Sequence, residues 1–213
     1  MAGLLSMRER QPFALYAAPP TLAVLDDNPI FEVLNRTVVP RRCLEPGRPE
    51  ALHDAAGTPL GLEVEGFAVP GKVPLFLERD GADPGRADAG ETLGLRVSAG
   101  GTALVFVPGC AAMTPALRAK LDGAGTVLFD GTLFRDDEMI RAGVGTKTGA
   151  RMGHMSVSGP EGTIAALAGL RIGRRVLIHL NNTNPVLLDD SPERAQVEAA
   201  GWLVARDGME FTV

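Results

Sequence analysis

The order in which hydrophobic patterns follow one another constrains the fold of this chain most strongly. Patterns typical of β-strands fill much of the first half: 60–69 alternates apolar with polar residues, 72–79 can pair with it, and 92–109 places two β-rich runs around Gly100-Gly101. From Thr114 onward, helical patterns alternate with short apolar strands. We therefore expect an α/β protein whose helices pack on a mixed sheet or on one side of a sandwich.

The remaining segments are assigned from end signals and turn residues. Three helices have cap signals: Thr114 before 114–124, Ser158 before 158–170, and Ser191 with Pro192 before 191–201. The other predictions are helices at 19–35 and 135–143, strands at 13–17, 36–44, 126–131 and 174–180, loops at 44–60 and 80–91, and a final hairpin over 202–213 turned at Asp207-Gly208.

Composition excludes several classes of protein. The 213 residues, 45% of them hydrophobic, suit one domain over 1–213. A net charge of −5 without a basic run argues against nucleic acid as a partner. No apolar run is long enough to span a membrane, and the start lacks the pattern of a signal peptide. Cys43 and Cys110 match no metal-binding or redox spacing, so we expect a soluble, cytoplasmic protein with reduced thiols.

Three polar residues lie where strands end and loops begin. Asp130 follows "TVLF", His179 follows "RVLI", and His154 lies in the loop "GARMGHMSVSG". Two histidines and one carboxylate suit an iron(II) centre with positions left for oxygen or substrate. The same residues can instead position a water or relay a proton. Structural roles stay open beside these: a backbone hydrogen bond for His179, exposure for His154, and an Asx-type turn at Asp130.

A glycine-rich segment, 143–153, carries Lys147 and Arg151. It lacks the order of glycine, lysine and hydroxyl residue that defines a phosphate-binding P-loop. Two interpretations remain: a loop that closes over an anionic substrate, for which arginine has suitably paired donors, and a solvated mobile loop.

Several of these segments together resemble one family. The segments are "TVLFDGTLFRDDEMI", "GTKTGARMGHMSVSGPEG", "LIHLNNTNPVL", "GLLSMRERQPFALYA" and "VPGKVPLFLE". They are similar to the pyrroloquinoline quinone (PQQ) biosynthesis protein B family, PqqB. The resemblance implies a metallo-β-lactamase-like αββα sandwich. It also implies a late role in making PQQ from a peptide-derived, cross-linked glutamate–tyrosine precursor, as an iron-dependent oxygenase that hydroxylates the tyrosine ring. The alternative is a non-catalytic carrier that transports PQQ or its precursor.

The resemblance also implies roles for residues. His179 matches the last metal-ligand histidine of the fold. Asp130 and His154 match positions beside the metals, where they serve as ligands, as partners of ligands or as proton carriers. Asn182 and Thr183 share the loop of His179 and are expected to steady it or to touch substrate. Lys147 and Arg151 suit a precursor that carries carboxylates. Iron(II) is the expected cofactor, with zinc as the alternative, and a homodimer stays open.

The chain departs from the family pattern in three places. The histidine- and aspartate-rich motif of the fold should precede Gly3, so we expect the N-terminal portion of the domain to be absent and the sandwich to be incomplete. The segment "FAVPGKVP" has no histidine where hydrolases of the fold usually supply a ligand, and Cys110 lies near the position of their bridging aspartate. A dinuclear zinc hydrolase is therefore disfavoured, and the activity of the isolated chain is left uncertain.

Overall fold

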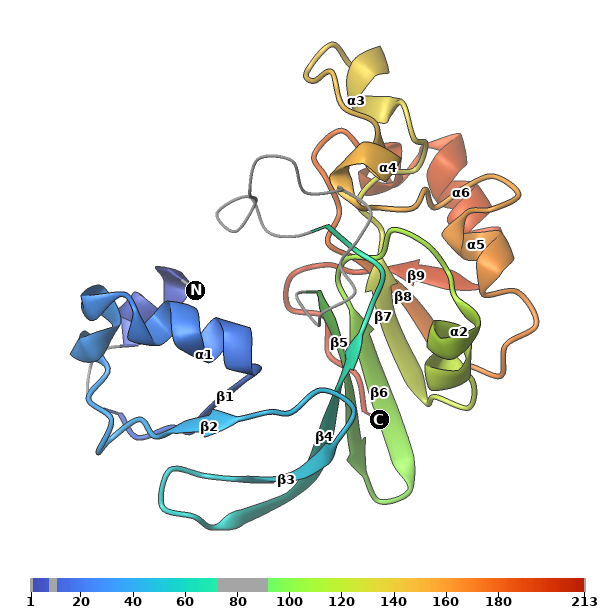
Figure 1. Cartoon of the computed structure of the whole chain (residues 1–213). Helices are drawn as coiled ribbons and strands as arrows, with labels where there is room; N and C mark the ends of the chain where they lie inside the picture. The colour runs from blue at the N-terminus through green and yellow to red at the C-terminus, as the bar shows by residue number, and fades with distance from the viewer. Residues whose placement is uncertain (1, 8–10, 73–91, 213) are drawn as a thin grey trace.

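The computed structural model describes residues 2–7, 11–72 and 92–212. Within these ranges a small sheet of two strands accompanies a sheet of seven strands (Figure 1). The strands are β1 (Leu15–Ala17), β2 (Arg41–Cys43), β3 (Pro49–His53), β4 (Pro59–Ala68), β5 (Leu93–Ala99), β6 (Thr102–Val107), β7 (Thr126–Asp130), β8 (Arg174–Ile178) and β9 (Trp202–Val204). The helices are η1 (Ala2–Met7), α1 (Pro19–Asp26), η2 (Pro29–Val33), α2 (Pro115–Leu121), α3 (Glu138–Arg141), α4 (Gly149–Met152), α5 (Thr163–Ala166), η4 (Pro185–Leu187) and α6 (Pro192–Ala199).

The larger sheet has its strands in chain order, from β3 to β9. Strands β3 to β6 are antiparallel neighbours, whereas β6, β7, β8 and β9 are parallel. Parallel neighbours need a crossover, and the helices α2 to α6 lie in those crossovers. The expected change from β-rich to alternating structure is therefore confirmed.

The hairpin predicted for 92–109 is present as β5 and β6. Gly100 and Gly101 form its turn with φ angles of 56° and 84°, a left-handed conformation that glycine adopts without steric cost. Leu95 pairs with Phe106 and Ala99 with Thr102. Strand β6 ends at Val107, three residues before Cys110.

Two predicted helix caps are also confirmed. The Thr114 hydroxyl accepts a hydrogen bond from the Leu117 amide at the start of α2. The Ser191 hydroxyl accepts one from the Arg194 amide at the start of α6, and Gly201 follows that helix with a φ of 78°. These bonds satisfy amides that the first turn of a helix leaves without partners.

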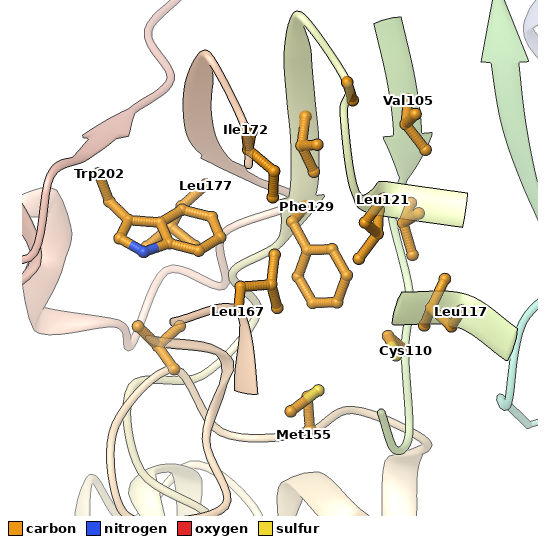
Figure 2. Close-up of a cluster of buried hydrophobic side chains, with 14 of the residues drawn as sticks. Val105, Cys110, Leu117, Leu121, Phe129, Met155, Leu167, Ile172, Leu177 and Trp202 are labelled. Carbon is orange, nitrogen blue, oxygen red and sulfur yellow. The ribbon is translucent and has the colours of Figure 1, made fainter. Parts of the chain in front are cut away.

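The main core lies between the seven-stranded sheet and the helices on one of its faces (Figure 1). Phe129 of β7 lies in the middle of the labelled side chains, between Leu121 of α2 and Leu167, which follows α5 (Figure 2). The buried members that Figure 2 labels are Val105, Cys110, Leu117, Leu121, Phe129, Met155, Leu167, Ile172, Leu177 and Trp202. This packing fixes β7 and β8, whose ends carry the site.

The helix predicted over 19–35 is divided in two. Asn28 is extended, with φ −112° and ψ 104°, between α1 and η2. Pro29 has no amide hydrogen and disfavours helical backbone at the residue before it, so α1 ends early. The strands predicted at 13–17 and 36–44 appear in shorter form as β1 and β2, which pair in parallel.

Three further predictions are corrected. The expected loop 44–60 contains β3, because its backbone pairs with β4 although its composition is typical of a loop. The helix expected from Ser158 is only α5, whose N-cap is Gly162, because the Ser158 hydroxyl donates to the Phe134 carbonyl instead. The final segment turns at Asp207-Gly208 but contributes only β9, which pairs with β8 rather than with a following strand.

The glycine-rich segment is more ordered than its composition indicates. Thr148 caps α4, and the Asp136 carboxylate accepts a hydrogen bond from the Ala150 amide. Gly153 ends the helix with a φ of 86°. The predicted strand at 72–79, apart from Lys72, and the predicted loop at 80–91 lie outside the described residues.

Candidate metal centre

Asp130 and His179 meet because neighbouring parallel strands end side by side. Asp130 is the last residue of β7, and its register partner is Ile178, the last residue of β8. His179 follows immediately. His154 arrives from a different segment, just after Gly153 reverses the chain at the end of α4. The structure thus brings together the three residues that the sequence singled out.

The Asp130 carboxylate is fully buried, with none of its side chain exposed. Its Oδ2 accepts a hydrogen bond from the Cys110 amide at 2.9 Å and lies 2.7 Å from His154 Nδ1. Its Oδ1 accepts from the Thr132 amide at 3.0 Å and from the Thr132 hydroxyl at 2.6 Å. The Asx-type turn considered for Asp130 is therefore present, and the same carboxylate also holds His154.

The two histidines lie against each other and differ in exposure. Their ring centroids are 5.3 Å apart, with 26° between the ring planes. The His154 side chain is 18% exposed and that of His179 is 54% exposed. His179 Nδ1 is 3.8 Å from Asp130 Oδ1, a distance too long for a hydrogen bond. The site is thus anchored on a buried carboxylate and opens to solvent at His179.

His179 has a strained backbone. Its φ of 54° is the only positive value among the described residues other than glycine. A left-handed conformation at such a residue costs on the order of 1 kcal/mol and persists where the surroundings enforce it. Here the Asn181 amide donates to the Thr132 carbonyl at 3.1 Å, and Thr132 Oγ1 lies 3.1 Å from the His179 carbonyl oxygen. These contacts turn the imidazole back toward Asp130.

The pKa values of this cluster depend on the shared carboxylate. Burial alone raises the pKa of Asp130, but the interactions with His154, His179 and Thr132 outweigh it and bring the pKa to about 2. The Asp130 carboxylate in turn raises the pKa of His179 above its ordinary value, against the opposing effect of partial burial. The carboxylate is therefore ionised at neutral pH.

The donor set fits a transition-metal ion. Asp130, His154 and His179 each offer one ligand atom, and these atoms all lie within 4.8 Å of one another. Imidazole and carboxylate ligands suit iron and zinc. Because Nδ1 of His154 faces Asp130, its Nε2 remains available as a ligand, an arrangement common among histidines that bind metals.

Cys110 contributes its backbone rather than its sulfur. Its amide holds Asp130, whereas its buried thiol contacts the Ala112 carbonyl at 3.3 Å. Burial and the nearby Asp130 charge raise the pKa of the Cys110 thiol to about 12. The candidate metal-binding group among the described residues comprises Asp130, His154 and His179 and does not include the Cys110 sulfur.

The predicted substrate-binding residues lie in two groups. Lys147 and Arg151 are exposed, and their side chains make no hydrogen bond or ion pair with any described residue. Asn182 is exposed on the loop of His179. Thr183 donates to Glu138 Oε1 at 2.7 Å and accepts from the Asn181 amide group at 2.6 Å, so its hydroxyl is already engaged in holding that loop.

The sequence analysis missed three residues that build the site. Thr132 contacts Asp130 and both histidines. Buried Asn184 donates to the carbonyls of Gly131 and Thr132, which ties the loop of His179 to the end of β7. Buried Glu138 accepts from the Phe134 amide and from Thr183. The only sequence signal was the hydroxyl two residues after Asp130, in "DGT".

Comparison with known proteins first defines the class. The family model of the beta-lactamase superfamily domain matches residues 1–180. A crystal structure of the metallo-beta-lactamase fold protein YhfI from Bacillus subtilis superposes with a TM-score of 0.62 at 12% identity, covering 98% of this chain and 70% of that protein, and supports the fold alone. The chain is a protein of the metallo-β-lactamase fold, as the sequence predicted.

Closer relatives then define the family. The chain is 58% identical to the coenzyme PQQ synthesis protein B of Gluconacetobacter diazotrophicus, over 100% of this chain and 69% of the relative. The coenzyme PQQ synthesis protein B of Methylorubrum extorquens is 52% identical, over 98% of this chain and 68% of that relative. The crystal structure of Zn(2+)-bound PqqB from Methylobacterium extorquens has a TM-score of 0.92 at 50% identity, again over 100% and 69% of the two chains. The chain belongs to the coenzyme PQQ synthesis protein B family.

Among the described residues, no helix is both long enough and apolar enough to cross a bilayer.

Proposed function

We propose that this chain takes part in coenzyme PQQ synthesis as an iron-dependent oxygenase that hydroxylates the tyrosine ring of a peptide-derived glutamate–tyrosine precursor. One observation carries the proposal: a carboxylate and two imidazoles offer ligand atoms within 4.8 Å of one another. Two histidines and a carboxylate are a ligand set used by iron(II) oxygenases. Family membership supplies the pathway, and the donor set supports the type of chemistry.

Asp130, His154 and His179 would hold the iron, and bound iron would supply the activation of dioxygen. Within this chain, the His179 side chain is the most exposed of the three and is therefore the one that a substrate can reach from solvent. His154 and Asp130 form a hydrogen-bonded pair that can hold a proton at the imidazole. If Asp130 instead keeps its present contacts when metal binds, it acts by orienting the histidines.

The stoichiometry of the reaction determines which reagents an assay needs. Hydroxylation inserts one oxygen atom of dioxygen into a ring C–H bond, and the second oxygen leaves as water. That balance needs two electrons and two protons, so a two-electron reductant such as ascorbate must be supplied. The proposed site lies close to exposed protein surface at His179, where a small precursor bearing carboxylates has access.

The first experiment is anaerobic iron(II) titration of the chain beside its His179→Ala variant. We expect one equivalent of iron for the chain and an affinity lower by at least about tenfold for the variant. Hydroxylated product is then measured with dioxygen, ascorbate and the precursor, using the Gluconacetobacter diazotrophicus relative as the positive control. Iron bound without hydroxylated product, under conditions in which the relative is active, would contradict the oxygenase proposal for this chain.

The alternative function is a carrier of PQQ or its precursor. It is favoured by Lys147 and Arg151, two exposed cations without a described side-chain partner. Both molecules carry carboxylates, which guanidinium and ammonium groups bind. The carrier predicts binding of PQQ to the metal-free chain, weakened by Lys147→Gln and Arg151→Gln but unchanged in His179→Ala. Loss of PQQ binding in His179→Ala would argue against it.

A further inference from the structure

The Thr132 hydroxyl lies at the centre of the three candidate ligands. Its oxygen is 2.6 Å from Asp130 Oδ1, 2.8 Å from His179 Nδ1 and 3.1 Å from His154 Nδ1. The side chain is nearly buried, so water does not replace these contacts freely. We propose that Thr132 is a positioning residue that holds His179 in the tautomer protonated at Nδ1 and thereby leaves its Nε2 free to bind metal.

The argument begins with the single proton of the hydroxyl. Four groups surround Thr132 Oγ1: Asp130 Oδ1, the His179 carbonyl oxygen and the Nδ1 atoms of His179 and His154. The carboxylate oxygen is charged and has the shortest of these contacts. If the proton pointed elsewhere, lone pairs of Thr132 and of Asp130 would face each other at 2.6 Å. The hydroxyl therefore donates to Asp130.

The tautomer of His179 follows from that assignment. With its proton given to Asp130, the Thr132 oxygen can only accept a hydrogen bond from His179. Since the contact is with Nδ1 at 2.8 Å, the proton of the neutral imidazole must be on Nδ1. The hydrogen bonds then run in one direction: His179 Nδ1 donates to the Thr132 hydroxyl, and that hydroxyl donates to Asp130 Oδ1.

The two histidines depend on Thr132 to different degrees. His154 Nδ1 has a direct contact of 2.7 Å with Asp130 Oδ2, so the carboxylate fixes its tautomer without help. His179 Nδ1 is 3.8 Å from Asp130 Oδ1 and reaches it only through the hydroxyl. Loss of the hydroxyl should therefore change His179 and spare His154. A role that is merely structural would affect both rings alike.

The tautomer assignment does not require the proposed oxygenase reaction. Only its consequence for metal binding rests on that proposal, in the arrangement in which Asp130 orients the histidines and is not itself a ligand. The experiment is long-range proton–nitrogen NMR of the ¹⁵N-labelled, metal-free chain at about pH 9, well above the ordinary pKa of a histidine side chain. Protonated and bare ring nitrogens have separate ¹⁵N shifts. We compare the wild-type chain with Thr132→Val, which keeps the shape, and with Thr132→Ser, which keeps the hydroxyl.

We expect both histidines to be protonated at Nδ1 in the wild-type chain and in Thr132→Ser. In Thr132→Val, His179 should become a mixture of tautomers while His154 stays unchanged. The exposed residue Thr146 provides the matched control, Thr146→Val, with no change at either ring. Iron(II) affinity should fall about 10- to 100-fold in Thr132→Val and recover in Thr132→Ser.

Two results would overturn the inference. One is a wild-type spectrum with His179 protonated at Nε2, which requires no variant to fold. The other is a folded Thr132→Val variant in which His179 keeps its Nδ1 proton. Neither result bears on product formation, so failure of this inference and failure of the oxygenase proposal can be told apart.

Discussion

His154 Nδ1 lies 2.7 Å from Oδ2 of Asp130, although 24 positions separate the two residues in the chain. The contact joins the end of β7 to the turn that follows α4. Asp130 is fully buried, so this pair is screened little by solvent, and it links the stability of the protein to the integrity of the site.

Asp130→Asn should destabilise the fold and weaken metal binding together. The substitution removes the charge and replaces one acceptor oxygen by an amide donor, which then faces the donors of Cys110, Thr132 or His154. We expect a loss of about 3 kcal/mol in the free energy of unfolding, because buried donors lose their acceptor. Urea unfolding at neutral pH measures it, with exposed Asp190→Asn as the control. Equal stabilities for the two variants would contradict the prediction.

Acid should remove the contribution of Asp130 to stability. Its pKa is about 2 in the folded protein against an ordinary value of 3.8. A depressed pKa means that the folded state favours the ionised form, so the stabilisation is present above pH 3.8 and is lost as the pH falls through about 2. The shift corresponds to about 2 kcal/mol. Urea unfolding between about pH 5 and pH 2 should show the unfolding free energies of the wild-type chain and of Asp130→Asn converging. If the difference between these two free energies stayed constant over this range, the lowered pKa of Asp130 would be contradicted.

The contribution of His179 to the free energy of unfolding should have the opposite dependence on pH. The Asp130 carboxylate raises the pKa of His179 above its ordinary value of 6.5. Stabilisation by the charged ring is therefore complete below pH 6.5 and is lost as the pH rises through the folded-state pKa. The difference in unfolding free energy between the wild-type chain and His179→Ala should shrink over that interval. The backbone strain at this position is the same at every pH and cancels from the trend.

The two cysteines should differ in reactivity. Cys43 is exposed, whereas Cys110 is buried and its thiol pKa is raised to about 12. Only the thiolate attacks a disulfide reagent. In the native protein we expect one thiol to react, and the second only after unfolding. Cys43→Ser should therefore show no reaction in the native state. Rapid labelling of Cys110 in that variant would mean that the segment holding Asp130 opens readily.

The Asn184 side chain should support the site through its hydrogen bonds to backbone groups of other residues. It is buried, and its side-chain amide donates to the carbonyls of Gly131 and Thr132 while its oxygen accepts from the Val186 amide. Asn184→Ala leaves the Gly131 carbonyl and the Val186 amide without their partner, whereas the Thr132 carbonyl keeps the Asn181 amide. We expect a loss of about 3 kcal/mol in unfolding free energy. The exposed neighbour provides the matched control, because Asn182→Ala should leave stability unchanged. Similar thermal melting curves for both variants would contradict this role.

Local patterns determined much of the fold from the sequence. The hairpin at Gly100-Gly101 and the helix caps at Thr114 and Ser191 each depend on residues close together in the chain, so their signals are complete there. The family resemblance added the metallo-β-lactamase fold. The strand-end positions of Asp130 and His179 were predictable for the same reason, because an apolar run that stops at a polar residue marks the end of a buried strand.

What depended on distant contacts was decided only by the tertiary structure. The pairing of β3 with β4 overrides a composition typical of loops, and the pairing of β9 with β8 replaces the expected final hairpin. The role of Thr132 was hidden for the same reason: its partner His179 lies 47 positions away and meets it only because β7 and β8 run parallel in register. The sequence by itself determined which side chains can bind a metal. The packing of two parallel strands determined which of their atoms meet.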